Sequence, residues 1–143
     1  MKIEIPLPSI ADQQKAVFLA ATEAGIQQLR ANLDAPQLPA QTEVDEALYP
    51  RTHLLRANEG WEAPAPELVR AYFRQFQAAF PEYGSDAKLA ALFGLSSDRR
   101  VRDYKQGSYK VPYGVWRHFL VLTGRAPQDI IPVMAFMAIA SAT

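Results

Sequence analysis

The stretch Asp86–Gly107 reads DAKLAALFGLSSDRRVRDYKQG, and the predicted fold is built outward from it. Apolar residues recur at helical spacing as far as Phe93, and Gly94 falls where such a helix would stop. Either serine of the pair 96–97 can cap a second, strongly basic helix that begins at Asp98. The stretch therefore predicts two helices joined by a tight turn, which is a helix-turn-helix pattern.

Three positions have the residue types that this pattern requires. Ala90 is small enough for the second helix to cross closely, and Gly94 permits a left-handed backbone in the turn. Val101 supplies an apolar contact from the second helix back to the first. We therefore expect all three residues to lie where the two helices meet.

Two segments carry a family resemblance: LAALFGLSSDRRVRDYKQG at 89–107 and KVPYGVWRHFLVLTG at 110–124. Together they resemble the lambda-repressor-like (Xre-type) helix-turn-helix DNA-binding domain, over about residues 66–140. The resemblance implies an all-α domain of five helices, with the helix at 97–106 in the major groove of double-stranded DNA. It also implies a transcriptional repressor or regulator that binds as a homodimer. At the start of the leading helix, where the family often has glutamine, this chain has Asp86.

The helix-turn-helix domain is expected to run from 66 to 143. Its five predicted helices lie at about 66–80, 86–93, 98–106, 112–123 and 127–140. The last of them is apolar nearly all round between Ile130 and Ile139, so it should pack on the core, on the N-terminal helix or on a second subunit. Dimerisation and burial within the monomer fit this segment equally well.

Residues 1–65 are predicted to be a helical N-terminal extension, with dimerisation or regulation as its expected roles. Its elements in chain order are an edge strand or extended arm at 1–8, a long amphipathic helix at 11–33, a proline-marked linker at 34–41 and a short helix at 42–49. Asp45 stands three residues after Thr42, at the capping-box position of the short helix. Residues 51–66 lack a sustained period and are predicted to be loop, with Trp61 packed onto the domain.

The basic second helix of the quoted stretch would present one face to solvent. If Val101 and Tyr104 face the core, steps of about 100° per residue place the opposite face outward. The candidate DNA-binding residues on and beside that face are Ser97, Asp98, Arg99, Arg100, Arg102, Asp103, Lys105, Gln106, Tyr109 and Lys110. Arginine, glutamine and aspartate can hydrogen-bond to base edges, and the flanking residues would contact phosphate. A solvated ion pair between Arg99 and Asp103 is the alternative interpretation of the same charges.

Charge is unevenly distributed, although the 143 residues carry no formal net charge. Residues 1–66 hold five basic and nine acidic side chains, a net charge of −4, whereas residues 67–143 hold ten and six, a net charge of +4. A local basic surface is what attracts a phosphate backbone, because salt screens charges over about 8 Å. The acidic part is expected to point away from DNA or toward a partner.

Composition places the chain among globular proteins, with 49% hydrophobic and 10% aromatic residues. It contains no cysteine, and no motif indicates a metal, a cofactor or a catalytic site, so we do not expect an enzyme. No segment has the features of a signal peptide or a membrane span, so a soluble, cytoplasmic protein without a membrane partner is expected. The alternative function is a protein–protein interaction module that keeps the helix-turn-helix fold without binding an operator.

Overall fold

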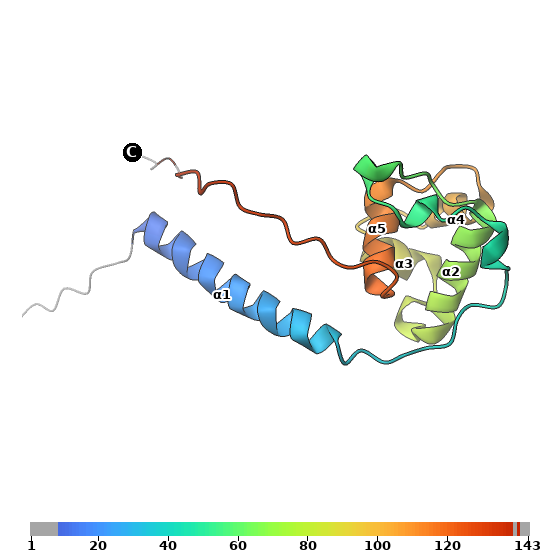
Figure 1. Ribbon diagram of the computed structural model, residues 1–143, viewed down its shortest axis with the longest axis horizontal. Coiled ribbons are helices and arrows are strands. Elements are labelled where there is room, and N and C mark those ends of the chain that lie inside the picture. The colour runs from blue at the N-terminus through green and yellow to red at the C-terminus, as the bar shows by residue number, and fades with distance from the viewer. Residues whose placement is uncertain (1–8, 139, 141–143) are drawn as a thin grey trace, which may run out of the picture. The chain divides into compact units, whose positions relative to one another are not determined.

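The computed structural model describes residues 9–138 and 140, and within them it is all-α, with five α-helices and no strand (Figure 1). The chain divides into two compact units. Unit 1 consists of the described residues of Met1–Leu38 and Ile131–Thr143, and unit 2 is Pro39–Ile130. Residues 1–8, where an edge strand or extended arm was predicted, lie outside the described residues.

The α-helices are α1 (Ile10–Asn32), α2 (Pro66–Ala79), α3 (Asp86–Leu92), α4 (Arg99–Gln106) and α5 (Tyr113–Leu122). All five were predicted, and their ends differ by at most one residue from the expected positions. Single 3₁₀ turns occur at Glu46–Leu48, Thr52–Leu54, Ala57–Glu59 and Pro81–Tyr83. The predicted short helix at 42–49 is thus reduced to one 3₁₀ turn, in which the Asp45 side chain accepts from the Ala47 amide at 3.0 Å.

Aromatic side chains from α2 and α5 form the centre of unit 2. Tyr72 stacks on Trp116 with ring centroids 5.7 Å apart, and Phe73 meets Phe119 edge-on at 5.0 Å. Trp116, Phe73 and Phe119 are fully buried, as is Leu89 of α3. Burial of each of these large side chains stabilises the fold by roughly 1.5–3 kcal/mol. The apolar faces of α2 and α5 thereby fix the platform on which α3 and α4 pack.

The turn between α3 and α4 has the geometry that its residues predicted. Ala90 and Val101 are buried, and Gly94 has φ +72°, in the left-handed region that favours glycine. The Leu95 amide donates to the Ala90 carbonyl at 2.9 Å and closes the C-terminal end of α3. The predicted serine cap on α4 is wrong: α4 begins at Arg99, and no side chain caps its first turn. The positions of Ala90, Gly94 and Val101 where α3 and α4 meet are confirmed.

Unit 2 begins at Pro39, whereas the sequence placed the domain boundary at 65/66. The segment before α2 belongs to unit 2 because polar contacts fasten it there. The Trp61 indole donates to the His53 carbonyl at 3.1 Å, and its ring meets Tyr113 of α5 edge-on at 5.3 Å. Glu43 forms an ion pair with Arg74 of α2 at 2.6 Å. Acidic residues that sequence order assigned to a separate extension therefore lie on the same unit as the basic α4.

The predicted helix at 127–140 is wrong for the described residues, because 125–138 contain no helix. Pro132 falls in the interior of the predicted helix, where it lacks an amide to donate and its ring disfavours helical geometry at Ile131. Asp129, expected in the first helical turn, instead forms an ion pair with Arg56 at 2.7 Å. Ile130, the last residue of unit 2, is 70% exposed and does not enter its core.

Helix α1 lies in unit 1, and none of its residues is buried. Its start was predicted well: the Ser9 side chain accepts from the Asp12 amide at 3.1 Å. The extended C-terminal segment belongs to the same unit, and its Phe136 meets Phe18 of α1 edge-on with ring centroids 4.8 Å apart. Among the expected packing places for the C-terminal apolar residues, contact with the N-terminal helix is seen at Phe136, and packing on a second subunit stays a prediction.

Candidate functional site

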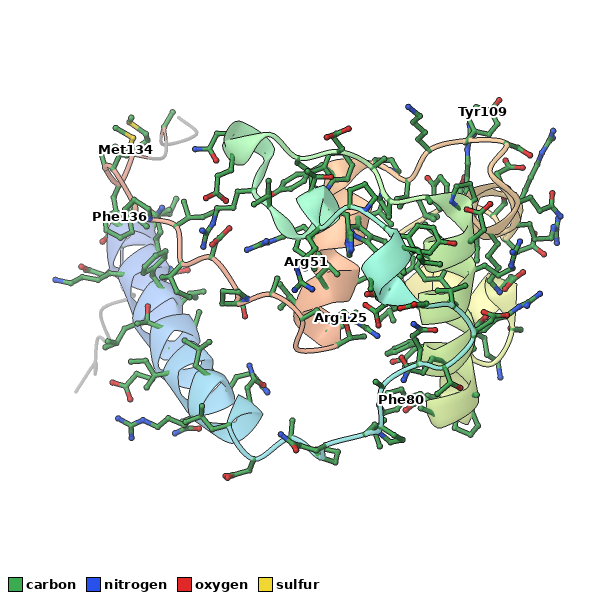
Figure 2. All side chains as sticks on the ribbon, turned by 45° about the vertical axis from the view of Figure 1, so that its right-hand side comes forward. Arg51, Phe80, Tyr109, Arg125, Met134 and Phe136 are labelled. Atoms are coloured by element: carbon green, nitrogen blue, oxygen red, sulfur yellow. The ribbon has the colours of Figure 1, made fainter. Side chains whose placement is uncertain are left out.

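The outward surface of α4 holds most of the side chains that the sequence singled out. We call the ten predicted residues the α4 surface; they lie on α4 and the turns that flank it. Seven are exposed, namely Ser97, Arg99, Arg100, Arg102, Gln106, Tyr109 and Lys110. The other three, Asp98, Asp103 and Lys105, are partly buried. Tyr109 extends from the loop after α4, away from the part of unit 2 that holds Arg51 and Arg125 (Figure 2).

Two features hold α4 in place with this face outward. Val101 and Tyr104 are buried, as the helical spacing required. At the C-terminal end, Gly107 adopts φ +85°, and the amides of Gly107 and Ser108 both donate to the Asp103 carbonyl. A Cβ on Gly107 would come within 2.7 Å of Pro66 at the start of α2. Glycine is therefore required there both for its backbone conformation and for the close approach of α2.

Lys105 does not point outward with the other basic residues. Its Nζ donates to Asp86 Oδ1 at 2.6 Å and to Gln77 Oε1 at 2.7 Å, and only 15% of its side chain is exposed. Burial acts to raise the pKa of Asp86, but the hydrogen bonds from Lys105 and Gln77 outweigh it and leave this pKa lowered. Asp86 thus ties α3 to α2 and α4, and its charge is compensated within unit 2.

Ion pairs on the outward face differ from the predicted one. Arg102 pairs with Asp98 at 2.7 Å and Arg100 approaches Asp103 at 3.9 Å, whereas the predicted pair between Arg99 and Asp103 does not form. The Arg100 guanidinium also lies 4.3 Å above the Tyr109 ring, a cation–π contact. Within the described part of the chain, the side chains of Arg99, Gln106 and Lys110 have no hydrogen-bonding or charged partner. These three are the ones most free to contact a ligand.

A second polar cluster, around His53, was missed by the sequence analysis. His53 is buried in the 3₁₀ turn Thr52–Leu54, and its Nδ1 accepts from Trp116 Nε1 at 3.2 Å. Nearby, the Tyr72 hydroxyl donates to Glu46, and the Arg125 guanidinium lies 3.8 Å above the Tyr72 ring. The residues come from four separate elements, so no local spacing in the sequence could have grouped them.

The cluster holds its ionisable groups in unusual states. Burial lowers the pKa of His53 to about 4, which keeps the imidazole neutral near pH 7. Burial and the neighbouring Glu46 raise the pKa of Tyr72 to about 12. Burial acts to raise the pKa of Glu46, but hydrogen bonds from Tyr72 and Gln41 outweigh it and leave this pKa lowered. Glu46 is therefore the ionised member of the three.

Comparison of the chain with protein-family models, curated proteins and solved structures found no match. None of the described helices combines the length and hydropathy that crossing a bilayer requires. Within residues 9–138 and 140, no three histidine, cysteine, aspartate or glutamate side chains are grouped closely enough to hold a metal ion. Function must therefore be inferred from the residues and their geometry.

Proposed function

We propose that this chain is a sequence-specific double-stranded DNA-binding protein, a transcriptional repressor or regulator, with α4 in the major groove. The observation that carries the proposal is the outward face of α4, where Arg99, Arg102 and Gln106 are exposed while the opposite face is buried. A short helix supported on two others, with its polar face free, is the arrangement that helix-turn-helix proteins insert into the groove. The lambda-repressor-like resemblance of the sequence points to the same use.

The side chains available on this face have the chemistry that base reading needs. Arginine donates two hydrogen bonds to guanine O6 and N7, and glutamine pairs with adenine N6 and N7. Arg99 and Gln106 need break no contact within the described residues to do so. Arg100 and Lys110 stand at the flanks, where phosphate contacts set the register of the helix. Lys105 is left out of the proposed contacts because Asp86 and Gln77 hold it inward.

The test is a fluorescence-anisotropy titration of a random-sequence duplex at about 50 mM and about 200 mM salt. The matched variants are Arg99→Ala/Arg102→Ala and Arg51→Ala/Arg74→Ala. Each double variant removes one unpaired and one ion-paired arginine of unit 2, so the change in net charge is the same. We expect the first variant to weaken binding at low salt, while the second leaves binding nearly unchanged. Equal loss in both variants, or no binding by the wild-type chain at low salt, would refute the proposal.

We further infer that the chain acts as a homodimer joined through α1. Large apolar side chains of this helix are exposed: Leu19, Ile26 and Leu33 repeat at seven-residue spacing and are 62%, 47% and 86% exposed. Leu29 falls on the same side at 100° per residue, which makes a stripe of coiled-coil type, and Phe18 lies at its edge in contact with Phe136. A second copy offers the same stripe, and two-fold symmetry matches the paired half-sites that helix-turn-helix dimers read.

Sedimentation equilibrium of the full chain tests the dimer. Leu19→Asp/Ile26→Asp is expected to convert the dimer to monomer, because it places charges at the centre of the stripe. Val17→Asp is the control, since Val17 is 69% exposed but lies on the opposite side of α1. A monomeric wild-type chain, or equal dissociation by the control, would exclude this interface.

The second candidate function is a protein–protein interaction module, which the absence of any buried residue in α1 favours. It predicts that α1 binds a different protein and that the α4 surface makes no contact with nucleic acid. A wild-type chain that stays monomeric and does not bind the duplex at low salt would favour this function over the repressor.

A further inference from the structure

A pocket of about 260 Å³ opens in unit 2 beside the His53 cluster, on residues that the DNA-binding proposal does not use. Its walls come from the segment before α2, from α2 and from the turn after α5. The lining residues that matter here are Glu46, Arg51, His53, Tyr72 and Arg125. Tyr49, Pro50, Leu54 and Leu68 add apolar surface. Such a mixture of apolar wall and a few converging polar groups is typical of a small-molecule site.

The cationic groups of this pocket exceed its anionic ones. Arg51 is exposed and has no ion pair with any described residue. Among the described residues, Arg125 also has no carboxylate within ion-pairing distance. Its guanidinium lies above the Tyr72 ring and donates to Gln75 Oε1 at 3.0 Å. Figure 2 shows the two arginine side chains close to one another beside α5. Glu46 is the acid of the lining, so one positive charge remains uncompensated.

The remaining polar groups add donors rather than acceptors. Both oxygens of the Glu46 carboxylate are already engaged, one by the Tyr72 hydroxyl and the other by Gln41 Nε2 at 3.2 Å. His53 uses Nδ1 to accept from Trp116, so its proton sits on Nε2 as a further donor. A ligand therefore meets two guanidinium groups and an imidazole N–H, and needs acceptor atoms with negative charge.

We propose that this pocket binds a small organic carboxylate, a monoanion whose carboxylate lies between Arg51 and Arg125 and whose apolar part lies against Tyr49, Leu54 and Leu68. The guanidinium fork matches the two oxygens of a carboxylate, and charge-assisted bonds of this kind are the strong ones. One surplus positive charge matches a monoanion and disfavours a dianion such as phosphate. The site does not depend on DNA binding, because it shares no residue with the α4 surface.

The experiment is an NMR titration of the full chain with sodium benzoate at constant ionic strength and at a pH above the second pKa of inorganic phosphate, with benzamide as the neutral isostere and sodium phosphate as the dianion. The two tryptophan indole signals report on the site, since Trp116 donates to His53 in the pocket wall and Trp61 donates to the His53 carbonyl. We expect benzoate to shift the Trp116 signal saturably, benzamide to leave it in place, and phosphate to bind at least tenfold more weakly.

Matched variants decide whether the arginine fork binds the carboxylate. Arg51→Gln removes the charge without breaking an internal contact, and we expect at least a tenfold loss of benzoate affinity. Arg51→Lys keeps the charge without the fork and should give an intermediate affinity. Arg99→Gln removes an equally exposed, unpaired arginine from α4 and should leave benzoate binding unchanged. Equal shifts by benzoate and benzamide, no saturable shift, binding retained in Arg51→Gln, or phosphate binding as tight as benzoate would each overturn the proposal.

Discussion

Acidification is expected to destabilise unit 2 through His53. The imidazole is buried and accepts from the Trp116 indole, so the fold favours its neutral form. Its pKa falls from an ordinary 6.5 to about 4 in the folded state. Between those two values the unfolded chain binds a proton that the folded chain does not bind. Stability is therefore fully present above about pH 6.5 and is lost as the pH falls toward 4.

The size of the effect follows from the two pKa values of His53. Each pH unit between them changes the free energy of unfolding by up to about 1.4 kcal/mol. Lowering the pH from about 7 to about 4.5 should thus remove roughly 2–3 kcal/mol, a large part of the 5–15 kcal/mol typical of a domain. Glu46 and Asp86, whose pKa values are lowered, act in the same direction but at lower pH, below their ordinary values of 4.5 and 3.8.

Urea denaturation followed by tryptophan fluorescence measures this loss, because Trp61 and Trp116 both lie in unit 2. His53→Asn removes the titrating group and keeps an acceptor oxygen in place of Nδ1 for the Trp116 indole. It should lower stability at pH 7 but flatten its dependence on pH between about 4.5 and 6.5. His118→Asn is the control: this exposed histidine should leave the wild-type slope unchanged. An equal slope in His53→Asn and wild type would refute the assignment of the transition to His53.

Three further predictions test how α4 and the segment before α2 are held in unit 2. Gly107→Ala should destabilise unit 2 by more than about 1 kcal/mol in a thermal melt, because it places a Cβ on a left-handed backbone and against Pro66. Gly124→Ala is the control: this glycine is also left-handed but has open space around it, so the loss of stability should be smaller. A double-mutant cycle between Asp86→Asn and Lys105→Met should give a coupling energy of about 0.5–3 kcal/mol. If the two losses of stability are simply additive, this ion pair does not link α3 to α4. Trp61→Ala should destabilise unit 2 by about 3 kcal/mol in the same assay; an unchanged stability would show that the segment before α2 is not anchored through its indole.

The helical elements of this protein are largely predictable from its sequence, because local rules determine them. Hydrophobic periodicity and flanking prolines and glycines located the ends of α1 to α5 to within one residue. The premise that Val101 and Tyr104 face the core is confirmed, since both are buried. The outward direction of Arg99 and Gln106 follows from the same spacing. The C-terminal helix was predicted incorrectly because its apolar residues were given more weight than Pro132, which is itself visible in the sequence.

Side-chain pairing and domain extent were decided only in three dimensions. Lys105 was assigned to the basic surface by its position on α4, but Asp86 and Gln77 draw it inward from two other helices. Arg102 pairs with Asp98, four residues earlier, and the ion pair between Arg99 and Asp103 does not form. The contacts of Lys105 depend on the backbone placement of neighbouring helices, which a single helical period does not contain.

The sequence by itself determined the helices, the turn at Gly94 and the polar face of α4, because each depends on residues within a few positions of one another. Only the tertiary structure decided that the segment from Pro39 belongs with the helical unit and that His53, Tyr72 and Arg125 meet around one pocket. These residues lie 19 to 72 positions apart in the chain. Contacts over such separations depend on how the helices pack as a whole, and for this reason no local pattern indicates them.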